Sequence, residues 1–145
     1  MKNKKAFTMV ELIFVIVIIG ILASVAIPKL AATRDDAEVS KARVTVASIR
    51  NALSMERQKR ILRGDFTQIT SVGDATNAFG KFSADKEGNQ ADVLEYPIKS
   101  STTKGHWFYN GDYTFMSTVA GNPVFIVSGG KFVCKNVGSC SALLD

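Results

Sequence analysis

The stretch that decides the fold is FTMVELIFVIVIIGILASVAI, residues 7–27. Its 21 residues include a single charged member, Glu11. As an α-helix rising about 1.5 Å per residue, it is roughly 31 Å long, close to the ~30 Å hydrocarbon thickness of a bilayer. A β-strand of this length would be exceptional. The sequence therefore predicts a membrane-spanning helix near the N-terminus.

The charges on either side of this stretch differ. Three lysines and no acid precede it, whereas the basic residues that follow it, within residues 29–36, are mixed with aspartates. This asymmetry predicts that the N-terminus is cytoplasmic. A secretory signal peptide is the alternative, with residues 23–26 as a small-residue processing site. Against this alternative, the apolar run continues into a helical pattern without a break.

The rest of the chain is ordinarily polar. Its 145 residues have room for one domain, or for one long helix and a small domain. The formal charge of the whole chain is +5, from 18 Lys and Arg against 13 Asp and Glu. Without the three leading lysines the count is 15 against 13, a net charge of +2, which indicates no particular charged partner.

Glu11 is the informative residue of the apolar stretch. A carboxylate at the middle of a membrane helix costs about 2.5 to 3.5 kcal/mol, and less near the interface. In an arbitrary membrane helix, an acid in the first turn simply favours the helix N-terminus and reaches the headgroups. The residues around Glu11 point to a further role.

Residues 4–13, KKAFTMVELI, resemble the prepilin cleavage signature of type IV pilins and type II secretion pseudopilins. In that family a short basic leader is removed before a Phe, and a Glu stands fifth in the mature chain, as Glu11 does when counted from Phe7. Pro28 falls at mature position 22, where the family often has a proline that kinks or locally melts the helix. Ala6 departs from the glycine usual before the cut. Alanine is still small, so cleavage between Ala6 and Phe7 is expected.

The resemblance implies a role for the new terminus. Cleavage creates an ammonium at Phe7, which the resemblance implies is N-methylated. A subunit entering a filament would bury this ammonium and the Glu11 carboxylate among apolar helices, where each is tolerable only if it is paired. We therefore expect Glu11 to meet the Phe7 amine of a neighbouring subunit and to set the stagger between subunits. The implied partners are further copies of the chain, a prepilin peptidase, membrane lipid and an inner-membrane platform driven by a cytoplasmic ATPase.

A second helical pattern follows Pro28. Apolar residues recur there at spacings of three and four: Val39, Ala42, Val46, Ile49 and Leu53. This stripe predicts packing on the protein's own sheet, with a short coiled-coil seam as the alternative. The helix is expected to end near Arg63, with Gly64 as its cap.

Basic residues crowd the predicted end of this helix: Arg57, Lys59, Arg60 and Arg63. We interpret them as a solvated end that complements the helix dipole. The alternative is contact with DNA phosphates, which would suit a subunit of a DNA-uptake pseudopilus.

The C-terminal part predicts an antiparallel meander. Turn residues separate short aromatic or β-branched runs at residues 106–109, 113–116, 124–127 and 131–134. Before them, a connecting region contains a possible short helix over residues 75–82. The expected α+β fold is pilin-like: a long kinked N-terminal helix, with a membrane half and an amphipathic half, packed on a sheet of three or four strands. The expected parts are a leader (1–6), a transmembrane and assembly helix (7–28), an amphipathic half (29–63) and a head (64–145), the head comprising the connecting region (64–104) and the meander with a C-terminal loop (105–145).

Cys134 and Cys140 are the two cysteines of the chain. Outside the cytoplasm such a pair suggests a disulfide, here closing a seven-residue loop worth about 2 kcal/mol in the chain-entropy model. Two free thiols are the alternative. Asp112 and Asp145 are the only acids after Glu95, too few for the six to eight oxygen ligands of calcium. We expect no metal and no cofactor.

No catalytic constellation is recognisable in the sequence. His106 is the single histidine, and there is no phosphate-binding glycine loop, carboxylate pair or zinc-ligand spacing. The sequence therefore predicts a structural subunit rather than an enzyme, a membrane-anchored hydrolase being a remote alternative. We expect it in a bacterial inner membrane with its head in the periplasm, and then in an extracytoplasmic filament. Small size favours a pseudopilin of type II secretion, whereas the terminal cysteines favour a type IV pilin.

Overall fold

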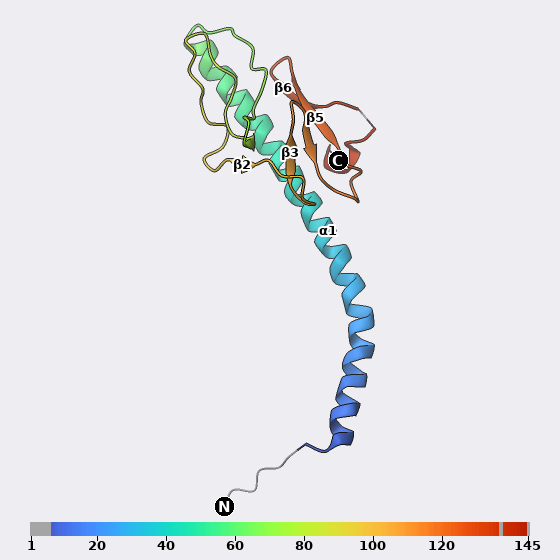
Figure 1. Cartoon of the computed structure of the whole chain (residues 1–145). Helices are drawn as coiled ribbons and strands as arrows, with labels where there is room; N and C mark the ends of the chain where they lie inside the picture. Colours follow the sequence, from blue (N-terminus) through green and yellow to red (C-terminus); the bar gives the residue numbers. More distant parts are fainter. Residues whose placement is uncertain (1–6, 137, 145) are drawn as a thin grey trace, which may run out of the picture. The chain divides into compact units, whose positions relative to one another are not determined.

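The computed structural model describes residues 7–136 and 138–144 (Figure 1). The chain divides into two units, Met1–Asp36 and Ala37–Asp145, and each is described by itself. One long helix, α1 (Met9–Leu62), provides most of the first unit and the first element of the second. The leader and the residue before the expected cut, Ala6, lie outside the described residues.

The first unit is helical from Met9 onward, and Pro28 lies inside the helix. Residues on both sides of Pro28 are helical, so the chain is not melted there. Since proline has no N–H, the carbonyl of Ser24 loses the bond that residue 28 would normally donate. The helix therefore has a local weak point at the place where the sequence predicts one.

In the second unit, one face of α1 is buried against the head. Its buried residues are Ala42, Val46, Ile49, Leu53, Glu56 and Arg60. Val39 is partly buried and packs on the same cluster. The predicted apolar stripe thus packs on the protein's own core, and the coiled-coil alternative is wrong.

The end of α1 is a glycine cap. Gly64 has φ of +71°, its N–H donates to the Ile61 carbonyl at 2.9 Å, and the Asp65 N–H donates to the Arg60 carbonyl at 2.8 Å. These two bonds form a Schellman motif, which satisfies carbonyls that the helix end would otherwise leave open. The predicted end near Arg63 and the cap at Gly64 are therefore correct.

The main sheet has four antiparallel strands in the order β3-β4-β5-β6. Consecutive strands are neighbours, as the predicted meander requires. The β5–β6 hairpin closes on the pair Ser128↔Lys131, with φ of +57° at Gly129 and +72° at Gly130. Two positive φ values in a two-residue loop are the conformation that matches strand twist, and glycine adopts it without strain. The strands are β3 (Trp107–Tyr109), β4 (Tyr113–Phe115), β5 (Val124–Ser128) and β6 (Lys131–Cys134).

The connecting region holds a second sheet of two strands, β1 (Asn77–Phe79) and β2 (Ile98–Lys99). The helix predicted over residues 75–82 is therefore wrong. The Asp74 carboxylate accepts hydrogen bonds from the backbone N–H groups of Thr76 and Asn77, at 2.9 and 2.8 Å. Such side-chain bonds compete with helical ones and favour a turn.

Aromatic side chains join the small sheet to the large one. The Phe79 ring stacks on Tyr113 at a centroid distance of 5.4 Å and meets Trp107 edge-on at 5.1 Å. The Tyr113 hydroxyl accepts a 2.8 Å hydrogen bond from the Val72 N–H, and burial raises the pKa of this phenol. A short C-terminal helix, α2 (Ser141–Leu144), adds Leu143 to the core.

Candidate functional site

The first turn of α1 is closed by a capping box. The Thr8 hydroxyl accepts from the Glu11 N–H at 3.3 Å. In return, Oε2 of Glu11 accepts from the Thr8 N–H at 2.8 Å and from its hydroxyl at 2.9 Å. The sequence Thr-x-x-Glu directly before an apolar run is the usual signature of this cap. In the single chain, Glu11 therefore fixes the start of the helix at Met9, two residues beyond the expected new terminus at Phe7.

The apolar side chains of the first unit are exposed on every side of the helix. No residue from 7 to 36 is buried within the chain. By length and composition, α1 is the one described helix that could cross a membrane. The exposed large apolar residues of this part are Phe7, Met9, Val10, Leu12, Ile13, Phe14, Val15, Ile16, Val17, Ile18, Ile19, Ile21, Leu22, Val25, Ile27 and Leu30.

This surface cannot remain in water. Burying one large aliphatic or aromatic side chain is worth about 1.5 to 3 kcal/mol, and exposed apolar patches beyond a few hundred Å² mark membrane or protein contacts. A helix that is apolar all round needs lipid or other apolar helices on all its sides.

The basic end of α1 differs from the prediction. Arg60 is 1% exposed, and its Nε lies 3.1 Å from Oε1 of Glu56, four residues earlier and also buried. Its Nη groups donate to the carbonyls of Ser83 and Ala84. The interpretation of this cluster as a solvated end is therefore wrong for Arg60. This arginine holds the connecting region onto the helix.

The same contacts weaken the DNA alternative. Arg60 is buried, and Arg63 lies within 3.8 Å of Glu56 and 3.9 Å of Asp85. Arg57 donates through Nη1 to the Gly129 carbonyl at 3.2 Å. The arginines of the cluster thus have partners within the chain, and only part of the charge faces outward.

Three arginines spaced by seven residues join α1 to the last part of the chain. Arg43 donates through Nε to the Ala142 carbonyl at 2.7 Å, and Arg50 through Nε to the Phe132 carbonyl at 3.1 Å. Arg57 completes the series at Gly129. Seven residues are nearly two helical turns, so the three side chains lie along one side of α1. We call this series the arginine row (Arg43, Arg50 and Arg57).

Sequence reasoning missed both arrangements. The signals were present: Glu56 and Arg60 have the i,i+4 spacing of a helical ion pair, and the arginine row has a constant interval of seven. Neither spacing reveals which backbone carbonyl a side chain will reach. The partner carbonyls lie in the connecting region, in the β5–β6 hairpin and in α2, and only the folded head brings these segments beside α1.

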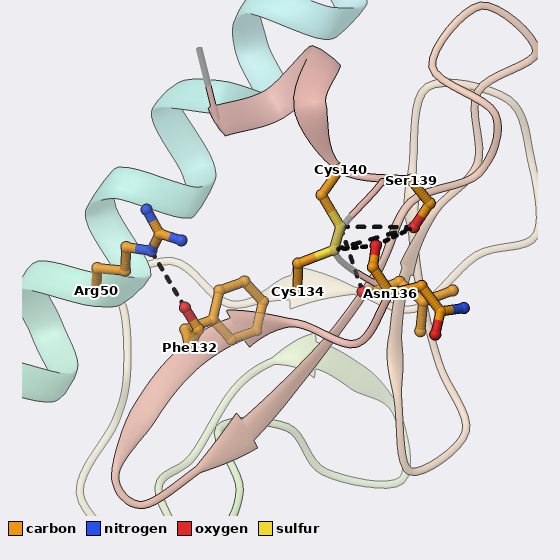
Figure 2. The surroundings of a disulfide bond; sticks show 7 residues. Arg50, Phe132, Cys134, Asn136, Ser139 and Cys140 are labelled. Atoms are coloured by element: carbon orange, nitrogen blue, oxygen red, sulfur yellow. Dashed lines mark hydrogen bonds between the residues drawn. A yellow bond between two sulfur atoms is a disulfide. The ribbon is translucent and has the colours of Figure 1, made fainter.

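Cys134 and Cys140 form a disulfide with a Cα–Cα distance of 6.1 Å. Figure 2 shows it beside the Arg50–Phe132 bond. Ser139 Oγ donates to the Asn136 carbonyl at 2.9 Å and lies 3.9 and 3.8 Å from the two sulfur atoms. The disulfide ties the end of β6 to the start of α2, whose Leu143 is buried in the core.

Two aspartates organise the connecting region. The Thr67 hydroxyl and the Thr67 N–H donate to the Asp65 carboxylate at 2.6 and 2.9 Å, and these bonds lower its pKa to about 2. For Asp74, the side-chain amide of Asn77 is the largest contribution, followed by the Thr76 N–H, and its pKa is also about 2. Hydrogen bonds to the charged form stabilise that form.

The single histidine of the chain has an ordinary environment. His106 is exposed, and its Nδ1 lies 3.2 Å from the Lys104 carbonyl oxygen. Within residues 7–136 and 138–144, there is no group of three or more His, Cys, Asp or Glu side chains that could hold a metal ion.

Residues 1–27 match the family profile described as "Prokaryotic N-terminal methylation motif". The chain is 40% identical over 53 residues to the type II secretion system core protein G of Escherichia coli, covering 37% of each chain. It is 35% identical over 97 residues to a fimbrial protein of Moraxella nonliquefaciens, covering 65% of this chain and 63% of the other. A type IV narrow pilus major component of Thermus thermophilus is 41% identical over 51 residues, covering 35% of this chain and 44% of the other.

The profile match covers residues 1–27. The chain spans little more than a third of the length of the secretion relatives that it matches. No solved structure matches the chain.

Proposed function

Since this chain belongs to the family of type IV pilins and type II secretion pseudopilins, we propose that it is a structural subunit of a pilus or pseudopilus filament, without catalytic activity of its own. The subunit is anchored in a membrane before assembly and is held by other copies afterwards. The observation that carries the proposal is the exposed apolar surface of residues 7–27, which is interrupted by one carboxylate, Glu11, and two small hydroxyl side chains, Thr8 and Ser24.

The exposed apolar surface of the N-terminal helix can be buried either in lipid or against the helices of neighbouring subunits. Before assembly, about 30 Å of apolar helix matches a bilayer. After assembly, the helices of neighbouring subunits replace the lipid. Because both environments are apolar, transfer between them costs little, provided that the charge of Glu11 is not left unpaired.

Glu11 supplies the selective contact. Its bonds to Thr8 both involve Oε2, so the capping box can persist while Oε1 accepts from the ammonium of a neighbouring Phe7. A register in which the two charges miss each other would bury an unpaired charge, at a cost of several kcal/mol. The proposed processing is cleavage between Ala6 and Phe7 by a prepilin peptidase, followed by N-methylation of Phe7.

The proposed orientation follows the flanking charges. Three lysines precede the apolar stretch, so the N-terminus lies in the cytoplasm and the head lies in the periplasm. An inner-membrane platform driven by a cytoplasmic ATPase would draw the subunit into the filament. The relatives include both secretion and pilus proteins. Experiment must therefore decide whether the filament is a secretion pseudopilus or a surface pilus.

The mature N-terminus, measured by mass spectrometry of the assembled protein, tests processing. The proposal expects a chain that begins at a methylated Phe7. Filaments built from chains that still begin at Met1 would refute it. Deletion of the gene, with parallel assays of protein export, surface filaments and motility, distinguishes a pseudopilus from a pilus.

Substitution tests the role of Glu11. In a Glu11→Ala chain we expect normal cleavage but at least a tenfold loss of filament. Glu11→Gln is the matched control, because glutamine can keep the capping bonds to Thr8 but has no charge. If the glutamine variant assembles as well as the wild type, Glu11 acts only as a helix cap and its proposed pairing is wrong.

A further inference from the structure

An open groove of about 370 Å³ lies between α1 and β6 in the head. Leu53 and Phe132, both fully buried, lie beneath it, and Val133 is partly buried beside them. Arg50 and Lys131 are exposed at its edges. No carboxylate is among the residues that line it. We call this the α1–β6 groove: an apolar floor with cations on both sides.

The groove is preorganised for an anionic partner. Its Arg50 is held by the bond from Nε to the Phe132 carbonyl, and the arginine row continues above and below it with Arg43 and Arg57. A guanidinium has five N–H groups, so one bond to a carbonyl leaves others for a partner. Because these side chains are already ordered, a partner has less conformational entropy to remove on binding.

An acidic surface, opposite in charge to the edges of the groove, lies on the other flank of α1. Residues 85–96, which we call the acidic segment, contain four acids and one lysine. Glu87, Asp92 and Glu95 are exposed in it, and the last residue, Tyr96, is 79% exposed. A large aromatic side chain with this exposure is a common anchor of protein interfaces.

The two surfaces face away from each other on one chain. Leu94 and Ile98 line a separate hollow with Ser48 of α1, whereas Arg50 lines the groove. Helix positions that are two residues apart in sequence, as Ser48 and Arg50 are, lie about 160° apart around the helix axis. Figure 1 accordingly shows β2 and β6 on opposite sides of α1. The acidic segment therefore cannot fill the groove of its own chain.

We propose that the acidic segment of one subunit docks in the α1–β6 groove of the next. Glu95 lies between Arg50 and Lys131 of the receiving subunit, and Tyr96 covers the apolar floor over Leu53 and Phe132. This inference rests on the proposed function as a filament subunit, for which it names the contact between heads.

The geometry suits a filament rather than a closed dimer. A contact between two different surfaces of the same chain is heterologous, and it repeats as an open helix unless the rotation closes a ring. One tyrosine and a few charges bury far less than the roughly 1,200 to 2,000 Å² of a stable interface. The contact therefore sets the register of heads whose helices already associate, and it contributes specificity more than affinity.

Cross-linking between two versions of the full chain tests the contact. One version carries Tyr96→Cys, the other carries Ser54→Cys at the groove edge, and both are produced together in cells that assemble the filament. We expect a disulfide-linked dimer of one chain of each kind in isolated filaments. The control pairs Tyr96→Cys with Thr118→Cys, an exposed position outside the groove, and should give at least fivefold less dimer.

Charge reversal tests the chemistry of the contact. Lys131→Glu and Glu95→Lys should each reduce filament yield at least fivefold, and the chain with both changes should recover most of it. Gln58→Glu is the control, because Gln58 is an exposed helix residue that lines neither the groove nor the hollows beside the acidic segment. Thermal unfolding of each purified chain in detergent verifies that the heads remain folded.

The outcomes separate the two proposals. Wild-type chains that are never processed or assembled would overturn the proposed function and this inference with it. Filaments with a mature Phe7 but no Tyr96–Ser54 cross-link, or with no recovery in the double reversal, would overturn this inference alone. The same holds if Lys131→Glu leaves the filaments intact and instead abolishes DNA binding or export of a secreted protein, because the groove would then serve that partner.

Discussion

Arg50 and Phe132 are joined across 82 residues of sequence by a 3.1 Å hydrogen bond from the guanidinium Nε to the backbone carbonyl (Figure 2). β6 is the last strand of its sheet, so the Phe132 carbonyl would otherwise be an open edge group. Open strand edges invite pairing with other chains. The arginine therefore covers the edge while it fixes the helix beside the sheet.

Replacing Arg50 by alanine should destabilise the head by about 1.5 to 3 kcal/mol, the range for a hydrogen bond to a charged group. Urea unfolding of the full chain in detergent, followed by tryptophan fluorescence from the buried Trp107, measures the effect. Asn51→Ala is the matched control, because Asn51 is exposed on the same helix. Equal stability of the two variants would show that the Arg50 bond contributes nothing.

Removal of Arg60 should have a larger effect. Arg60→Ala leaves the buried Glu56 carboxylate without its closest cation, and breaking one half of a buried pair costs about 3 to 5 kcal/mol. Lys59→Ala, one residue away and exposed, should change stability by less than about 0.5 kcal/mol. In the double variant Glu56→Leu with Arg60→Met, no charge is left unpaired. Its loss of stability should be smaller than that of Arg60→Ala, and a larger loss would contradict this account.

Acid should loosen the connecting region through Asp65 and Asp74. Both carboxyls have a pKa of about 2 in the folded chain, against about 3.9 in an unfolded one. Because each pKa is lower in the folded chain than in the unfolded one, the two carboxylates add to the free energy of unfolding above about pH 4. This contribution is lost as the pH falls from about 4 towards 2.

Unfolding midpoints measured from pH 7 to pH 2 give the test. The wild type should lose stability mainly below pH 4. A chain with Asp65→Asn and Asp74→Asn should start less stable at pH 7 and lose less between pH 4 and 2. An unchanged acid profile in that variant would assign the acid sensitivity to other carboxyls.

Reduction of the disulfide should release the C-terminal end. Cys134→Ser with Cys140→Ser removes the bond that ties β6 to α2, at a cost of about 2 kcal/mol for so short a loop. Hydrogen exchange should rise first at the Leu143 amide, which donates to the Cys140 carbonyl at 2.9 Å. Protection at the Val46 amide, in the buried part of α1, should remain. Uniform loss of protection would instead mean that the bond supports the whole head.

Much of this protein was predictable from local pattern. The apolar run, the position of Glu11 and the cap at Gly64 depend on residues within a few positions of one another. The four strands of the meander are also visible, because glycine-containing turns separate aromatic and β-branched runs. The failures are instructive. Residues 75–82 have apolar spacing that suits a helix, but the Asp74 side chain captures two N–H groups that a helix would need.

By itself the sequence determined the membrane-length helix and the cap at Gly64, and it predicts the processing site, since these depend on short-range spacing and on hydrophobicity. Tertiary structure alone decided that Arg60 is buried, that the arginine row meets the carbonyls at Gly129, Phe132 and Ala142, and that a groove remains beside β6. The physical reason is distance along the chain. A hydrogen bond or a groove between segments some 80 residues apart depends on how the sheet packs on the helix, and no local pattern encodes that placement.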